Sequence, residues 1–269
     1  MASLVCRFVS IVLLALPFSA FGQPGDDSEI NRAREDLGIG RFKAPSIESV
    51  FDQLNALQPI PFDKVWRPLP DRLPQDRPRM ALLAGDMIAD GFLVVSAQRA
   101  SKIEPVGRGL VRLAKGLGIA EHLTKRGRHV IELADSERWG EIRKELIKTQ
   151  AEAESALLKL KDDEIVNLVG LGGWLRGLEI TSATVADDYS PDRAKHVFKP
   201  ELADPFLDKI HTFRPRLRSL PVMQVIDKDL RGIREIVLGR EGDRPFSASE
   251  VRRIRDLSRD ANRMINSPD

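Results

Sequence analysis

Two long segments of this chain carry almost no charge, and they limit the choice of fold more than any other feature. Residues 80–97 contain only two charged side chains, Asp86 and Asp90, and residues 165–186 contain only Arg176 and Glu179. A helix that is apolar on every side lies either at the centre of a helical bundle or across a membrane. The two segments are therefore either central helices or membrane spans.

The charges favour central helices. Two aspartates near the middle of a membrane span would cost about 5–7 kcal/mol, whereas the Leu, Ile, Phe and Val side chains of residues 80–97 return only about 2–4 kcal/mol. Polar residues weaken the second segment further as a span: Asn167, Thr181, Ser182 and Thr184. We therefore expect both segments to be central helices of a soluble protein.

Small residues recur along both segments at helical spacing. Each glycine inside a helix costs up to about 1 kcal/mol relative to alanine, and a strip of small residues offsets this cost by letting two helix backbones approach closely. The sequence therefore predicts close packing of the two helices through two strips: Ala81, Gly85 and Ala89 on one, and Gly170, Gly173 and Gly177 on the other.

The four charges of the two segments form the candidate site. Asp86 and Asp90 are four residues apart and share one helix face, while Arg176 and Glu179 are three apart. Three carboxylates and one guanidinium in a low-dielectric interior require further compensation. These residues could act in acid–base catalysis, or Asp86, Asp90 and Glu179 could hold a divalent cation. The alternative is a structural polar network, completed by Arg99 or Arg112.

Motifs for known cofactors and reactions are absent from the sequence. There is no nucleophile elbow, no P-loop and no dinucleotide-binding fingerprint, so no cofactor is evident beyond a divalent cation. Residues 239–250 resemble an EF-hand loop in outline, but their first and sixth positions are wrong for calcium. Ser247 and Glu250 are explained equally well by a capping box that starts the last helix.

The prolines divide the rest of the chain. A short helix is expected from Ser46 to about Leu57, followed by an extended strap that holds six prolines within residues 59–78. Apolar residues in the strap, such as Phe62 and Val65, indicate that it lies against the domain. Further helices are expected at about 79–100, 106–117, 119–135, 137–161, 163–187, 191–198, 201–212, 222–238 and 248–265. The predicted fold class is all-α: an irregular bundle of eight to ten helices, spanning residues 79–269, with a proline-rich N-terminal strap over residues 46–78.

Residues 1–22 have the pattern of a secretory signal peptide. Arg7 precedes an apolar run over residues 8–18, and Ala20 and Gly22 occupy the small positions of a cleavage site. The run is shorter than the roughly 20 residues that span a bilayer. We therefore expect cleavage after Gly22, a poorly ordered leader over residues 23–45, no transmembrane span in the remaining chain, and a periplasmic or secreted protein if the source is bacterial.

The charge balance excludes one class of partner. The 42 basic and 40 acidic side chains do not form the strongly basic surface of a nucleic-acid binder. The residue patterns of the helices are explained by packing, and no catalytic motif is present. The favoured function is therefore a binding or interaction module in the cell envelope, with a protein or a small molecule as partner. The alternative is an enzyme or metal-dependent protein that uses the carboxylates between the two central helices.

Overall fold

The computed structural model describes residues 47–159 and 162–267, and every regular element in those ranges is a helix. The all-α class is therefore confirmed. The elements are α2 (Ile47–Ala56), α3 (Phe62–Val65), α4 (Arg77–Ser96), α5 (Ala100–Leu117), α6 (Ala120–Asp135), α7 (Trp139–Lys159), α8 (Asp163–Asp187), α9 (Pro191–Ala194), the 3₁₀ helix η1 (Pro200–Leu202), α10 (Ala203–Thr212), α11 (Pro215–Arg218), α12 (Pro221–Leu238) and α13 (Ala248–Asn266).

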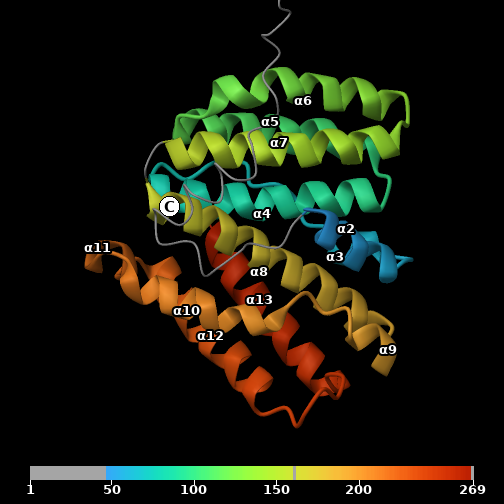
Figure 1. Ribbon diagram of the computed structural model, residues 1–269, viewed down its shortest axis with the longest axis vertical. Coiled ribbons are helices and arrows are strands. Elements are labelled where there is room, and N and C mark those ends of the chain that lie inside the picture. Colours follow the sequence, from blue (N-terminus) through green and yellow to red (C-terminus); the bar gives the residue numbers. More distant parts are fainter. Residues whose placement is uncertain (1–46, 160–161, 268–269) are drawn as a thin grey trace, which may run out of the picture.

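The two apolar segments form α4 and α8, which lie between two groups of helices. Helices α5, α6 and α7 stack on one side of this pair, and α10, α12 and α13 lie on the other (Figure 1). The most extensive contact between any two described elements is that of α4 with α8, followed by that of α8 with α13. The predicted central position of both helices is confirmed, and no described helix is long and apolar enough to span a membrane.

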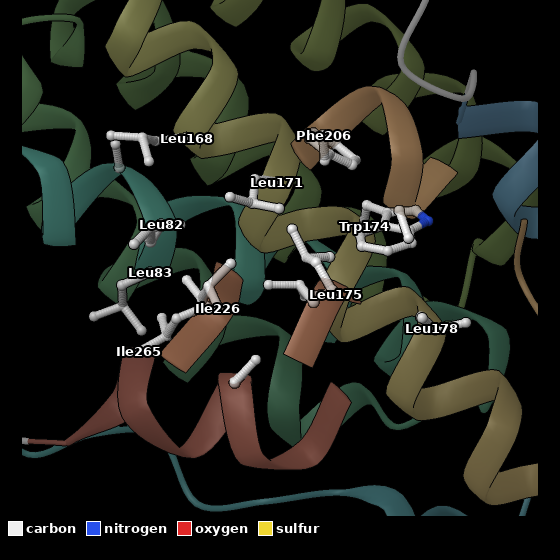
Figure 2. Packing of buried hydrophobic residues seen from close by; sticks show 14 of the residues in the cluster. Leu82, Leu83, Leu168, Leu171, Trp174, Leu175, Leu178, Phe206, Ile226 and Ile265 are labelled. Atoms are coloured by element: carbon white, nitrogen blue, oxygen red, sulfur yellow. The ribbon is translucent and has the colours of Figure 1, made fainter. Parts of the chain in front are cut away.

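The core on the α13 side of the pair is densely filled. Figure 2 shows the leucines of α4 and α8 meeting side chains from α10, α12 and α13, with Trp174 close to Phe206. The ring centroids of these two residues are 5.0 Å apart. Because α8 offers apolar residues on all sides, it can serve both this core and a second cluster that joins α2 to α7 around Phe92 and Ile142.

Local capping chemistry explains where the long helices begin and end. The side chain of Asp76 accepts a hydrogen bond from the Arg79 amide at the start of α4, and Asp162 does the same for Ile165 at the start of α8. Gly118 adopts a left-handed conformation, with φ of 84°, and ends α5 as expected. The capping box of Ser247 with Glu250 is present at the start of α13, so this feature explains the loop that resembles an EF-hand.

The start of α5 differs from the expectation. The predicted helix began after Pro105, but α5 begins at Ala100 and contains this proline. The buried side chains of Ile103 and Val106 lie on both sides of Pro105, so packing outweighs the loss of one backbone hydrogen bond. The described residues also contain more helices than expected, because Pro200 and Pro215 each start a helix of only one turn, while the helix expected over residues 191–198 ends already at Ala194.

The strap lies against the domain, as its apolar residues indicated. It is not fully extended, because Phe62–Val65 forms the single-turn helix α3, and both Phe62 and Val65 are buried. The Phe62 ring stacks on that of Trp66, with centroids 5.4 Å apart. The expected signal peptide, the leader and the capping residue Ser46 lie outside the described residues.

Candidate functional site

The structure brings together the four charged residues of the two apolar segments: Asp86, Asp90, Arg176 and Glu179. The buried guanidinium of Arg176 donates from Nε to Asp90 Oδ1 at 2.7 Å and from Nη1 to Glu179 Oε2 at 2.8 Å. Its Nη2 donates to the backbone oxygen of Val65 at 2.8 Å. All three nitrogen atoms of the guanidinium group are therefore engaged, and one of them holds the strap onto α8.

Arg67 of the strap supplies the missing positive charge. Its Nη2 forms an ion pair with Asp86 and lies 3.3 Å from Asp90 Oδ2. The expectation that Arg99 or Arg112 completes the network was wrong, because neither contributes to the ion pairs formed by the described residues of the cluster. Arg99 instead lies over the ring of Phe62, 5.1 Å from its centroid. The strap approaches α4 more closely than its sequence indicated, which places Arg67 between the two aspartates.

Helix α13 completes the charge cluster, by which we mean Asp86, Asp90, Arg176, Glu179 and Arg67. Asn262 Nδ2 donates to Glu179 Oε2 at 2.9 Å, and Asn266 Nδ2 donates to Asp86 Oδ2 at 3.0 Å. The more exposed Arg259 lies 3.4 Å from Glu179 Oε1. With Arg259 included, three carboxylates face three guanidinium groups, which is the compensation that buried charges require.

Asp86 is the least satisfied member of the charge cluster. It is fully buried, and its Oδ1 has no hydrogen-bond partner. Burial raises the pKa of its carboxyl group to about 6, with Asp90 acting in the same direction, although Arg67 and Arg176 oppose the increase. Because one pKa unit corresponds to about 1.4 kcal/mol, keeping this carboxylate ionised at pH 7 costs on the order of 3 kcal/mol of folding free energy.

We expect the stability of the wild type to rise relative to that of an Asp86→Asn variant as the pH falls from 7 to 4. The folded-state pKa of Asp86 lies above its unfolded value, so the native protein takes up the proton first and acidification removes the penalty. The free-energy difference between the two proteins should change by about 2–3 kcal/mol, measured by urea unfolding at each pH.

Asp192→Asn is the control for this measurement. A hydrogen bond from Lys195 lowers the pKa of the exposed Asp192 carboxyl group, so its contribution to stability is lost on acidification and has the opposite sign. A difference between the wild type and Asp86→Asn that stays constant from pH 7 to 4 would contradict the assignment to Asp86.

The charge cluster has little room for substrate or metal. Arginine and asparagine donors already occupy most of its carboxylate oxygens, and none of its members lines the large cavity described below. Among the described residues, no group of three His, Cys, Asp or Glu side chains is arranged to hold a metal ion. The geometry is that of a structural network joining α4, α8, α13 and the strap.

A large apolar cavity, which the sequence reasoning missed, lies on the other side of the central pair. It has a volume of about 290 Å³ and is lined by side chains from α4, α5, α6, α7 and α8. No described lining residue is charged. Helix α6 packs mainly on α5 and α7, and α7 touches α4 and α8 only sparsely. The cavity therefore occupies the space where these two layers fail to close on each other.

Glycines open this cavity. Their surroundings differ from those of the glycines where α4 and α8 touch. A Cβ at Gly85 would lie 1.9 Å from Val169 O, and one at Gly172 would lie 2.0 Å from Leu82 O, so these two allow α4 and α8 to touch. A Cβ at Gly107 or Gly170 would meet nothing within 4 Å. Both line the cavity, where a side chain would take up its space.

The predicted small-residue strips were therefore only partly right. Gly85 and Gly173 do lie at the contact between α4 and α8, and Gly172 joins them. Gly170 faces the cavity instead, and a Cβ at Gly177 would meet the ring of Phe198 at 3.1 Å. A usable signal was the glycine content of α5 and α6, where Gly107 and Gly127 interrupt amphipathic helices although no neighbouring backbone lies within 4 Å of the Cβ position at either residue.

Comparison of the chain with protein-family models, with curated proteins and with solved structures finds no match.

Proposed function

We propose that this protein binds an apolar small molecule in the cavity between α4 and α8 on one side and α5, α6 and α7 on the other. The observation that carries the proposal is a cavity of about 290 Å³ whose described lining residues are all uncharged. This is about twice the ~150 Å³ of an engineered apolar cavity that binds benzene, and it approaches the ~300 Å³ of the smaller natural ligand sites.

The energetic cost of an empty cavity supports a ligand. The cavity is partly open to solvent, so without a ligand its apolar lining stays in contact with water and forgoes about 25 cal/mol for each Å² that a bound apolar molecule would cover. Each glycine that opens the cavity adds up to about 1 kcal/mol relative to alanine. A bound apolar molecule would restore the lost contacts and offset this cost.

The described surface and interior fit a small-molecule ligand better than they fit a protein partner. Among the residues whose side chains the structure describes, the only large apolar ones that are exposed are Tyr189 and Leu238. The described surface therefore has no apolar patch for a partner protein to bind, whereas the interior has an apolar site. An enzymatic role for the charge cluster has less support, because its carboxylates are buried and mostly paired.

We also propose that the protein acts outside the cytoplasm, in the cell envelope if the source is bacterial. The support for this proposal is the leader pattern of residues 1–22, with its apolar run and its small residues before the expected cleavage site. A carrier or sensor for a poorly water-soluble molecule is consistent with such a location, since such a molecule needs a shielded site in an aqueous compartment.

Binding of the uncharged fluorescent probe N-phenyl-1-naphthylamine tests the proposed function. We expect its fluorescence to rise when it is titrated with the wild type. In a Gly170→Leu variant, the leucine should fill the space that the probe uses and weaken binding at least about tenfold, or 1.4 kcal/mol. Because a Cβ at residue 170 meets nothing within 4 Å, the variant should keep its fold.

Gly140→Leu is the matched control. Gly140 is also a helical glycine whose Cβ would meet nothing within 4 Å, but it is exposed and does not line the cavity. This variant should bind the probe as the wild type does, and thermal unfolding should show that both variants fold. The proposed function is wrong if the wild type does not bind the probe, or if both leucine variants bind it equally well.

A further inference from the structure

Few polar atoms face the cavity, and the hydrogen bonds of most of them are already committed. Among the described lining residues, only Thr149, Asn167 and Trp174 carry polar side-chain atoms. The Trp174 indole donates to Lys199 O at 3.1 Å, and the Thr149 hydroxyl donates to Glu145 O at 2.7 Å. Asn167 is therefore the residue whose hydrogen-bonding capacity needs an explanation.

The amide of Asn167 is held in one orientation. Its Nδ2 donates to the backbone oxygen of Asp163 at 2.6 Å, one turn earlier in α8. The reversed amide would place two acceptor oxygens against each other, so the nitrogen must face Asp163. The side chain belongs to a residue that is only 5% exposed, yet its Oδ1 accepts no hydrogen bond from any described residue.

The Asn167 side chain lines the cavity, and its Oδ1 is not one of the fully buried polar atoms that lack a partner. This oxygen is therefore open to a hydrogen-bond donor inside the cavity. We propose that Asn167 Oδ1 accepts a hydrogen bond from the bound molecule, and that the ligand is an uncharged hydrocarbon carrying a hydroxyl group. This inference rests on the proposed function, since it assumes that the cavity binds an apolar molecule.

The lining argues against charged head groups. None of the described lining residues is a lysine, arginine or histidine that would neutralise a carboxylate, or an acidic residue that would neutralise an ammonium group. A buried charge without a partner is far more costly than a buried hydroxyl group with one. A carboxylate would also bring its negative oxygens towards Asn167 Oδ1, which is itself an acceptor.

Three compounds of equal chain length test the inference: decan-1-ol, its methyl ether and decanoate. Displacement of the naphthylamine probe from the wild type gives the dissociation constant of each compound. We expect the alcohol to bind about tenfold more tightly than the ether, which keeps an oxygen but has no proton to donate. Decanoate should bind most weakly.

Asn167→Leu should remove the preference, so that the alcohol and the ether bind equally while the probe itself still binds. Thr149→Val is the control and should retain the preference for the alcohol. Asn167→Ala serves in place of Asn167→Leu if the larger side chain prevents folding. The comparison of ligands on the wild type needs no variant at all.

The outcomes separate the two proposals. If the wild type binds the probe but holds the alcohol and the ether equally well, the assignment of Asn167 is wrong and the proposed function stands. The assignment is also wrong if the preference persists without the asparagine, or if decanoate binds most tightly. If the probe does not bind to the wild type, both proposals fail together.

Discussion

Replacing Arg176 by Met should lower the free energy of unfolding by about 3–5 kcal/mol, as measured by urea denaturation at pH 7. The substitution removes three hydrogen bonds at once, to Asp90, Glu179 and the backbone of Val65. Two buried carboxylates then lose their shared counter-charge in an interior where water does not replace it. The strap loses its contact with α8 in the same step.

A second substitution separates the charge effect from simple loss of packing. Adding Asp90→Asn to Arg176→Met should recover part of the lost stability, because the uncompensated carboxylate is then neutral. The coupling between the two changes should lie in the range of about 0.5–3 kcal/mol that neighbouring residues show.

Arg138→Met is the matched control for this cycle. Arg138 forms an ion pair with Glu141 at the same three-residue spacing as Arg176 with Glu179, but both partners are half exposed. Its replacement should cost less than about 1 kcal/mol. Similar small costs for both arginines, without coupling to Asp90, would show that the charge cluster does not hold the central helices together.

Gly172→Ala should destabilise the protein strongly, whereas Gly170→Ala, two residues away, should not. The Cβ of the first would lie 2.0 Å from the backbone oxygen of Leu82, so α4 and α8 must move apart. Overpacking costs typically about 1–3 kcal/mol and occasionally more, and a backbone obstacle places this variant at the upper end. Gly170→Ala meets nothing and should gain up to about 1 kcal/mol from helix propensity.

Both changes are measured as shifts in the midpoint of urea denaturation. Gly85→Ala provides an independent check on the first variant, because its Cβ would lie 1.9 Å from Val169 O on the facing helix. Equal effects at positions 170 and 172 would mean that the two glycines do not divide between a helix contact and a cavity.

The sequence predicted the parts of the site that stand out against their surroundings. Asp86, Asp90, Arg176 and Glu179 are the only charges within residues 80–97 and 165–186, so burial and pairing followed from the pattern. Arg67 and Asn262 could not be predicted in the same way. Each lies among many other polar residues, and only the packing of the strap and of α13 selects it for the charge cluster.

The cavity was missed for a different physical reason. A glycine in a helix indicates a position without a side chain. The sequence alone does not show whether a neighbouring backbone or an empty space lies opposite that position. Gly172 and Gly170 are two residues apart and have these two different surroundings. Only the spacing between the helix layers distinguishes them, and that spacing depends on contacts distant in sequence.

The charge cluster also has a consequence for the order in which the chain can mature. Asp86 Oδ2 is bound by Arg67 of the strap and by Asn266 in the last turn of α13. During synthesis from the N-terminus, the aspartates of α4 emerge long before that last turn exists. Their final surroundings, and hence the burial of α4, can form only when nearly all of the described chain has been made. A chain truncated before α13 would lack both the Asn266 hydrogen bond to Asp86 and the Arg259 contact with Glu179, a state that quality-control proteases could distinguish from the finished protein.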